Sequence, residues 1–366
     1  MSRFFASAAH DAASVACGCC APLSRRSFLG AAASVAGSMS LPAAALAQAP
    51  AAAPAPASRE RIDTHFHYYP PSIQKSGGLA NPLIAAWSPA KALEEMDRNG
   101  VKTGILSMAS APLDWFRMEP EASRKFVREI NDYGADMMRE APGRYGLFAF
   151  LSMVDVEGTL KEIEYAFDVL KADGVGLSTS YVDKYPGDPK FAPIFEELNR
   201  RKAVVYFHPT TAACCAGILP GIGDSWIEVP HDTSRAVLSL LFSGSLRKFR
   251  DITFLWSHGG GTIPMLANRI DWLSNIQVRN RKEVAPDGVE AEFKRFYYDT
   301  ANAGYAGPMA ALLKLVPVSQ VVFGTDYPYV STEANMKALR SAGLSDEQIR
   351  AIETQNAKQF LPRLRG

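Results

Sequence analysis

From Arg61 onward a short apolar run followed by a stretch with helical periodicity occurs eight times, and this repeat restricts the fold more than any other feature. The apolar runs are continuous, as expected for strands buried on both faces of a parallel sheet. In the longest helical stretch Phe126, Ile130, Tyr133 and Met137 recur at helical spacing. Eight successive strand–helix pairs predict a (β/α)8 TIM barrel. A doubly wound open sheet is the alternative, but no glycine-rich phosphate-binding sequence follows the first strand.

The pattern also predicts where each element lies. Strands are expected at Arg61–His67, Lys102–Ser107, Arg144–Leu151, Gly174–Ser178, Ala203–His208, Ile252–His258, Phe296–Thr300 and Gln320–Asp326. Helices are expected at Pro89–Asn99, Pro120–Glu140, Glu157–Ala172, Phe191–Arg201, Thr233–Phe249, Ile263–Ile276, Pro308–Leu315 and Ser331–Ala342. The chain has 366 residues, 47% of them hydrophobic, so residues 59–366 suffice for one barrel domain with a single large core. The net charge of +1 gives no reason to expect a nucleic-acid partner.

The first 47 residues have the pattern of an export signal and are predicted not to belong to the fold. Arg25 and Arg26 directly precede a weakly apolar run from Phe28 to Ala47, which ends in a small-x-small cleavage pattern. This combination predicts a twin-arginine signal peptide, recognition by the twin-arginine translocase, and a periplasmic or secreted mature protein. An uncleaved membrane anchor is the alternative, since a run of about 20 residues can span a bilayer. Residues 48–58 are rich in alanine and proline and are expected to form a disordered linker.

The five cysteines do not form a metal-binding pattern. Cys17, Cys19 and Cys20 lie in the predicted leader and have no partner cluster. Cys214 and Cys215 are adjacent, and adjacent cysteines form a disulfide only with a strained backbone. Two free thiols, or a lining role, are therefore expected in place of a stabilising disulfide.

Three histidines and one aspartate stand at the carboxyl ends of predicted strands, where barrels build their active sites. His65 and His67 are two positions apart on the first strand, so both side chains point to the same side. His208 ends the fifth strand and Asp326 ends the eighth. Taken singly, these residues are also consistent with a pair of surface histidines, a structural histidine and a helix N-cap. Together they predict one site for zinc or a similar divalent ion, with bonds of about 2.0–2.2 Å.

A further histidine, His258, ends the sixth strand and is followed by Gly259, Gly260 and Gly261. Glycines allow a tight turn and a close approach of substrate to the backbone. A histidine beside a metal, without being its ligand, is suited to moving protons near neutral pH. Direct ligation of the metal is the competing role for His258.

These residues lie in motifs that resemble one enzyme family. The motifs are D-T-H-F-H (63–67), E-E-M-D-x-x-G-V (94–101), F-H-P-T (207–210), D-T-S-R-A (232–236), S-H-G-G-G-x-x-P (257–264) and F-G-T-D-Y-P (323–328). The sequence is similar to the amidohydrolase superfamily, in the branch of the aminocarboxymuconate-semialdehyde, γ-resorcylate and 6-methylsalicylate decarboxylases. The resemblance implies that His65, His67, His208 and Asp326 ligate zinc or manganese, that His258 handles protons, and that Asp326 is also catalytic. It further implies a homodimer, with Arg269 binding the substrate carboxylate, in some relatives from the neighbouring subunit.

Two departures from the family pattern restrict the expected number of metal ions and the expected class of substrate. The fourth strand, Gly174–Ser178, has no lysine to carry a carboxylate that bridges two metals, so one metal is expected. Ala92 stands where aminocarboxymuconate-type relatives have an arginine, so a dicarboxylate substrate is not favoured. His231 and Trp115 are candidate substrate contacts, although a solvent-facing histidine and a packing tryptophan are the ordinary interpretations of these residue types.

The favoured function is therefore the metal-dependent, non-oxidative decarboxylation of a small aromatic, hydroxybenzoate-like or enol-type carboxylic acid, with His258 as the acid–base residue. The same site is consistent with a hydrolase of a small lactone, ester or amide, in which His258 activates a metal-bound water. A non-catalytic periplasmic protein that binds a metal or a ligand is the third alternative. Release of carbon dioxide from hydroxybenzoates, compared with release of acid from lactones, distinguishes the first two.

Overall fold

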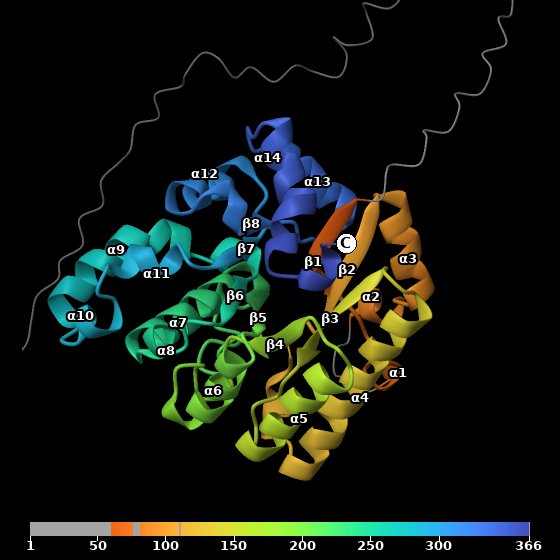
Figure 1. Cartoon of the computed structure of the whole chain (residues 1–366), viewed down its shortest axis with the longest axis horizontal. Coiled ribbons are helices and arrows are strands. Elements are labelled where there is room, and N and C mark those ends of the chain that lie inside the picture. The colour runs from red at the N-terminus through yellow and green to blue at the C-terminus, as the bar shows by residue number, and fades with distance from the viewer. Residues whose placement is uncertain (1–59, 76–80, 110, 366) are drawn as a thin grey trace, which may run out of the picture. The chain divides into compact units, whose positions relative to one another are not determined.

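In a computed structural model of the chain, residues 60–75, 81–109 and 111–365 are described. Eight parallel strands form one sheet in the order β1 to β8, and the helices lie outside it (Figure 1). The strands are β1 Arg61–His67, β2 Val101–Ser107, β3 Tyr145–Phe150, β4 Gly174–Ser178, β5 Val204–His208, β6 Thr253–Trp256, β7 Tyr297–Asp299 and β8 Val321–Val322. The alternation of strands and helices predicted from the sequence is confirmed.

The sheet curls until its first and last strands meet. The backbone N–H of Thr64 donates to the carbonyl of Phe323 at 2.9 Å, and that of His67 donates to Tyr327 at 2.9 Å. Phe66 and Tyr327 also form a parallel bridge. The arrangement is a near-closed eight-stranded barrel, consistent with a (β/α)8 fold, and it brings residues from both ends of the described chain to one rim.

The helices agree with the predicted order but differ from it in several places. They are α1 Pro71–Lys75, α2 Pro82–Ala85, α3 Pro89–Arg98, α4 Pro120–Glu140, α5 Val156–Asp168, α6 Ala192–Arg200, α7 Glu228–Phe242, α8 Ser245–Lys248, α9 Ile263–Gln277, α10 Arg281–Val284, α11 Val289–Phe293, α12 Ala306–Leu315, α13 Thr332–Arg340 and α14 Asp346–Arg350. The single helix predicted for 233–249 is wrong: α7 begins five residues earlier, and a break separates it from α8. The break lies at Gly244, whose φ of 82° is left-handed and ends a helix.

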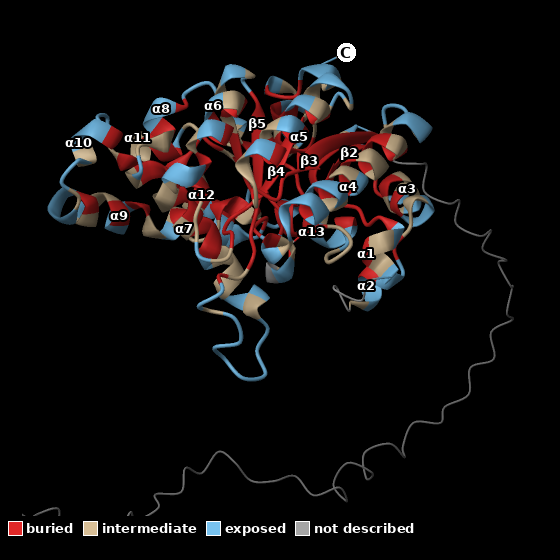
Figure 2. Cartoon of the chain, turned by 90° about the horizontal axis from the view of Figure 1, so that it is seen from below, coloured by how far each residue is buried: buried red, intermediate tan, exposed pale blue. Residues whose placement is uncertain are grey.

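Figure 2 shows that the strands are buried, and their apolar side chains form two layers, one on each face of the sheet. The larger layer lies between the strands and the helices and includes Trp256, Phe207 and Leu147. The smaller fills the barrel interior, where Phe148 and Tyr206 stack with ring centroids 5.3 Å apart. The Tyr206 ring in turn contacts His65 edge-on at 5.5 Å. Packed aromatic side chains therefore form the floor on which the strand-end histidines rest.

Several predictions concern residues that the structure does not describe. The twin-arginine signal at 1–47 and the linker at 48–58 both lie outside the described residues and stay predictions. Among the described helices, none combines the length and the apolar character needed to cross a bilayer. The eighth strand, Val321–Val322, is shorter than predicted, and Asp326, four positions beyond its end, has a left-handed φ of 65°.

Candidate metal centre

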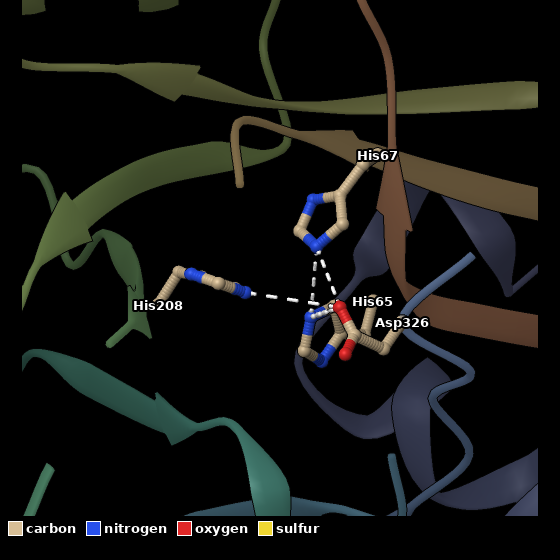
Figure 3. A group of neighbouring side chains, drawn as sticks. All are labelled: His65, His67, His208 and Asp326. Atoms are coloured by element: carbon tan, nitrogen blue, oxygen red, sulfur yellow. Dashed lines mark hydrogen bonds and ion pairs between the residues drawn. The ribbon is translucent and has the colours of Figure 1, made fainter. Parts of the chain in front are cut away.

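The four predicted ligands meet at the carboxyl ends of the strands (Figure 3). His65 and His67 belong to β1, His208 ends β5, and Asp326 follows β8. One ligand atom from each lies within 4.8 Å of the others, and all four residues are buried. Nε2 of His65 is 3.1 Å from Nε2 of His67, and Oδ1 of Asp326 is 2.9 Å from Nε2 of His67. The geometric part of the sequence prediction is confirmed.

Each of the three histidines uses its other ring nitrogen in a hydrogen bond that leaves Nε2 facing the centre. Nδ1 of His65 donates to Oδ2 of Asp299 at 2.8 Å. Nδ1 of His67 donates to the carbonyl of Ser107 at 3.0 Å, and Nδ1 of His208 donates to the carbonyl of Pro209 at 3.0 Å. Carbonyl oxygens only accept, so in His67 and His208 the proton resides on Nδ1 and the Nε2 lone pair is available. This pattern of second hydrogen bonds is typical of histidines that bind metal.

The donor set fits a divalent cation. Nε2 of His208 is buried and has no hydrogen-bond partner among the described residues, which is costly unless an ion or another group satisfies it. Oδ1 of Asp326 lies 3.2 Å from Nε2 of His65 and 3.9 Å from Nε2 of His208. Three imidazole nitrogens and one carboxylate oxygen suit zinc, manganese and similar ions. These four residues therefore form a buried site for a divalent metal.

The electrostatics of the site also favour a positive ion. Burial lowers the pKa of His67 and holds the pKa of His208 well below its usual range, so both rings are neutral and able to ligate. Burial acts in the same direction on His65, but the carboxylates of Asp299 and Asp326 raise its pKa to about 10. Burial would raise the pKa of Asp326, yet the charge at His65 keeps that pKa well below the ordinary value. The carboxylates thus stabilise positive charge at the point where the ligand atoms converge.

The two oxygens of Asp326 face different partners. Oδ1 points to the histidine ligands, whereas Oδ2 lies 3.4 Å from Nε2 of His258 and accepts a hydrogen bond from the side chain of Asn302 at 2.9 Å. The His258 ring centroid is 4.9 Å from that of His65. Nδ1 of His258 is buried, and no residue that the structure describes forms a hydrogen bond with it. His258 therefore stands beside the ligand group and contacts it through the carboxylate.

The backbone around His258 is held in a conformation that needs glycine. His258 itself has a φ of 52°, and its N–H donates to Oδ1 of Asp299 at 2.8 Å. At Gly261, with a φ of 63°, a Cβ atom would lie 2.1 Å from the carbonyl oxygen of Pro230. Any side chain at this position would therefore displace α7 from the turn, which explains part of the triple-glycine motif.

Three polar residues of the site were not singled out from the sequence. Asp299 joins a metal ligand to the His258 backbone, and Asn302 orients the second oxygen of Asp326. Asp63 accepts hydrogen bonds from the N–H of His65 and the hydroxyl of Thr325, at 3.0 and 2.6 Å, so it ties β1 to the end of β8. Burial raises the pKa of Asp63 to about 7 in spite of these bonds. Asp299 lies at the end of a predicted strand, and that position was the available signal.

The three predicted substrate contacts lie outside the ligand group. Arg269 is on the exposed side of α9. His231 is exposed in the first turn of α7, where its Nδ1 donates to the carbonyl of Ile227 at 2.7 Å. Trp115, in the short 3-10 helix Leu113–Arg117, packs edge-on against Phe126 with ring centroids 4.7 Å apart. Their roles toward substrate stay predictions. The fourth strand has no lysine near the ligands, as expected for one metal.

Comparison with known proteins assigns the family. A sequence model of the amidohydrolase family matches residues 62–363, so the chain belongs to that family. It is 34% identical over 325 residues to a 6-methylsalicylic acid decarboxylase from Aspergillus aculeatus, covering 83% of this chain and 97% of the relative. It is 33% identical over 325 residues to a decarboxylase from Aspergillus niger, covering 83% of this chain and 88% of that relative. The fold is similar to a crystal structure of a dihydroxybenzoic acid decarboxylase from Polaromonas with bound manganese. The TM-score is 0.72 at 20% identity, and the match covers 84% of this chain and 98% of that chain. The protein is an enzyme of this family.

Proposed function

We propose that the enzyme decarboxylates a small aromatic hydroxy acid without oxidation, using one divalent metal and His258. The observation that carries the proposal is the placement of the Asp326 carboxylate. Its Oδ1 faces the Nε2 atoms of the three histidine ligands, and its Oδ2 faces Nε2 of His258. A metal site with a proton carrier beside it has both elements that protonation of a ring carbon requires. Two relatives that are decarboxylases by name are about one third identical to this chain over most of both chains. They support decarboxylation over hydrolysis.

The ligand residues would hold the metal, which supplies Lewis-acid polarisation of the substrate's hydroxyl or carboxylate oxygen. His258 delivers a proton to the ring carbon that carries the carboxylate, and that carbon becomes tetrahedral. The bond to the carboxylate then breaks, carbon dioxide leaves, and the bonding electron pair restores the aromatic ring. Oδ2 of Asp326, 3.4 Å from Nε2 of His258, orients the ring for this transfer. Burial of the ligand group excludes water from the reacting atoms.

The reaction is tested with a panel of hydroxybenzoates, including 6-methylsalicylate, and a panel of small lactones and esters. We expect carbon dioxide from at least one hydroxybenzoate and no acid from the lactones. The variant His258→Asn should retain the metal and lose roughly 10²–10⁴-fold in turnover. Acid release from lactones without carbon dioxide would support the hydrolase. If His258→Asn releases carbon dioxide as fast as the wild type, His258 is not the acid–base residue.

We propose that the resident metal is a single zinc ion, with manganese as the alternative. The set of three nitrogens and one oxygen is common in zinc sites. Elemental analysis of the purified protein should return about one equivalent per chain. Two equivalents would contradict the mononuclear assignment, and manganese in place of zinc would contradict only the choice of metal.

We propose that the enzyme is a homodimer that uses the exposed face of α9. Three apolar side chains of this helix are exposed: Met265 by 74%, Trp272 by 61% and Ile276 by 65%. They are spaced seven and four positions apart. Arg269 lies between them on the same stripe, so a second subunit that covers these apolar side chains would receive its guanidinium. This placement supports a carboxylate-binding role across the interface.

Sedimentation of the wild-type protein and of Trp272→Asp tests the dimer. We expect the variant to be monomeric and the wild type dimeric. In the dimer, Arg269→Ala should raise KM for the carboxylate substrate with a smaller effect on kcat. A wild-type protein that sediments as a monomer at all concentrations would contradict the proposal.

We further propose export by the twin-arginine translocase, supported by Arg25 and Arg26 before the apolar run. Replacement of both arginines by lysine should retain the protein in the cytoplasm of the native host. Equal amounts of wild-type and variant protein in the periplasm would contradict this route.

A further inference from the structure

A pair of free thiols lies on an exposed loop that the proposed reaction does not use. The loop runs from His208, at the end of β5, to the start of α7, and projects below α7 in Figure 2. Cys214 is exposed and Cys215 is partly exposed, and within the described part of the chain neither forms a disulfide. Their sulfur atoms are 3.1 Å apart and share a hydrogen bond. Two thiols in contact on an exposed loop are accessible to small oxidants.

We propose that Cys214 and Cys215 form a reversible vicinal disulfide by exchange with small disulfide-bearing oxidants, and that the pair is a redox site on the loop that follows the metal ligand His208. The distance between the sulfurs must fall by about 1 Å to reach a bond of 2.03–2.05 Å. Both side chains already face each other, so this closure needs no movement of a second element.

The backbone geometry makes such a bond labile. Consecutive Cα atoms are about 3.8 Å apart, below the usual range of about 4.4–6.8 Å across a disulfide. The peptide between the two cysteines must therefore twist when the bond forms. Strained and exposed disulfides are reduced readily, and such bonds act as labile sites and do not stabilise the fold. This agrees with the expectation that the pair does not form a stabilising disulfide.

The loop can absorb this twist without losing its attachment to the barrel. On one side, Thr210 donates through its N–H to the hydroxyl of Thr179 at 3.0 Å and through its own hydroxyl to the carbonyl of Ala111 at 3.1 Å. At the tip, the N–H of Gly217 donates to Oδ1 of Asp224 at 3.0 Å. The two cysteines lie between these anchors, in a turn where the N–H of Cys215 donates to the carbonyl of Ala212 at 2.8 Å. Oxidation should therefore change the segment 211–227 while β5 keeps its structure.

The order of the exchange follows from the exposure of the two thiols. Cys214 is the more exposed of the pair, and the hydrogen bond between the sulfurs raises the pKa of the Cys215 thiol. Cys214 loses its proton to solvent, and its sulfur attacks one sulfur of the oxidant and releases the other as a thiolate. Cys215 then loses its proton to solvent and attacks the mixed disulfide at Cys214, releasing the second oxidant sulfur. Two protein thiols are oxidised, and one oxidant disulfide is reduced to two thiols.

Mass spectrometry of the full chain after treatment with oxidised glutathione tests the proposal. Cleavage after Lys202 and Arg235 gives the peptide 203–235, which contains Cys214 and Cys215 and no other cysteine. After oxidation and alkylation, we expect this peptide without alkyl groups and lighter by the two hydrogens lost. Dithiothreitol should restore two alkylated cysteines. A peptide that keeps two alkylated thiols, or carries two glutathione groups, under excess oxidant would overturn the proposal.

Two matched variants and a structural readout complete the experiment. Cys215→Ser should trap one glutathione on Cys214, whereas Cys214→Ser should acquire it more slowly because the exposed attacking thiol is absent. Hydrogen exchange of the wild type should change over 211–227 on oxidation and stay constant over 204–208. Equal glutathione uptake by the two variants would contradict the assigned order, and unchanged exchange in the loop would contradict its role as a redox-sensitive segment. Neither readout depends on the substrate or the reaction.

Discussion

At the scale of single residues, Asp299 joins the metal ligands to the proposed proton carrier. One of its oxygens accepts from Nδ1 of His65 and the other from the backbone N–H of His258, each at 2.8 Å. A single carboxylate therefore sets both the orientation of a ligand ring and the position of the neighbouring turn. Such a residue affects the metal without touching it.

We expect Asp299→Asn to weaken metal binding by about 10–100-fold, because an amide is a poorer acceptor for the His65 ring and no longer stabilises positive charge there. Competition with a chromophoric chelator measures the affinity. Asn302→Ala is the matched comparison, since Asn302 contacts Asp326 Oδ2 and no histidine ligand, and its effect on metal affinity should be smaller. Equal affinities for Asp299→Asn and the wild type would refute the orienting role.

The ligands could be predicted from the sequence, whereas the residues that orient them could not. His65 and His67 are recognisable because residues two positions apart at the end of a strand point to the same face of the sheet. Asp299 and Asn302 carry no such pattern, because their roles depend on the path of the β7–α12 connection, where Asn302 has a left-handed φ of 55°. Sequence periodicity does not encode that path.

At the scale of elements, a buried carboxylate clamps α4 and α5 together. Oε2 of Glu162 on α5 accepts from Nε and Nη2 of Arg128 on α4, at 2.9 and 2.7 Å. Its Oε1 accepts from the side chain of Asn131 at 2.8 Å, and Oδ1 of Asn131 accepts the N–H of Phe150 on β3 at 2.7 Å. The network connects two helices to the sheet through one acidic side chain.

We expect Glu162→Ala to lower the free energy of unfolding by about 1–3 kcal/mol, because it leaves the buried Asn131 donor without this partner. Urea denaturation measures the change. Glu164→Ala is the control, since Glu164 is exposed on the same helix, and it should change the free energy by less than about 0.5 kcal/mol. Similar losses in both variants would contradict a specific stabilising role for the Glu162 contacts.

Element boundaries were predicted well where a cap or a proline marks them. The α4 helix has the predicted bounds, 120–140, and begins with Pro120, which is favoured in a first turn. The α7–α8 region was mispredicted because apolar spacing continues across Gly244, and only the backbone conformation there ends the helix. The short helices α10 and α11 follow α9 without a strand between them, so the strand–helix alternation gave no sign of them.

At the scale of the whole molecule, the metal site is also a contact between the two ends of the barrel. His65 and His67 come from β1, Asp326 follows β8, and the strands between them complete the ring. An ion bound to all four residues therefore links the same strands that close the sheet. Binding to the folded state alone stabilises that state by mass action.

Removal of the metal with a chelator should therefore lower Tm. At a free metal concentration about 100 times Kd, the bound ion contributes about 2.7 kcal/mol, which corresponds to a shift of several degrees for a domain of this size. Calorimetry before and after chelation measures it, and added zinc or manganese should reverse it. His65→Ala, which lacks a ligand, should have a Tm that does not respond to the chelator. An unchanged wild-type Tm on chelation would indicate that no metal bridges the strands.

The closure of the ring has a consequence for biosynthesis. During translation the two β1 imidazoles leave the ribosome first, and the carboxylate that completes their coordination is 259 positions behind. A nascent chain arrested before that point holds histidines but no finished site. The complete set of four ligands can therefore form only after the last strand has been synthesised and folded.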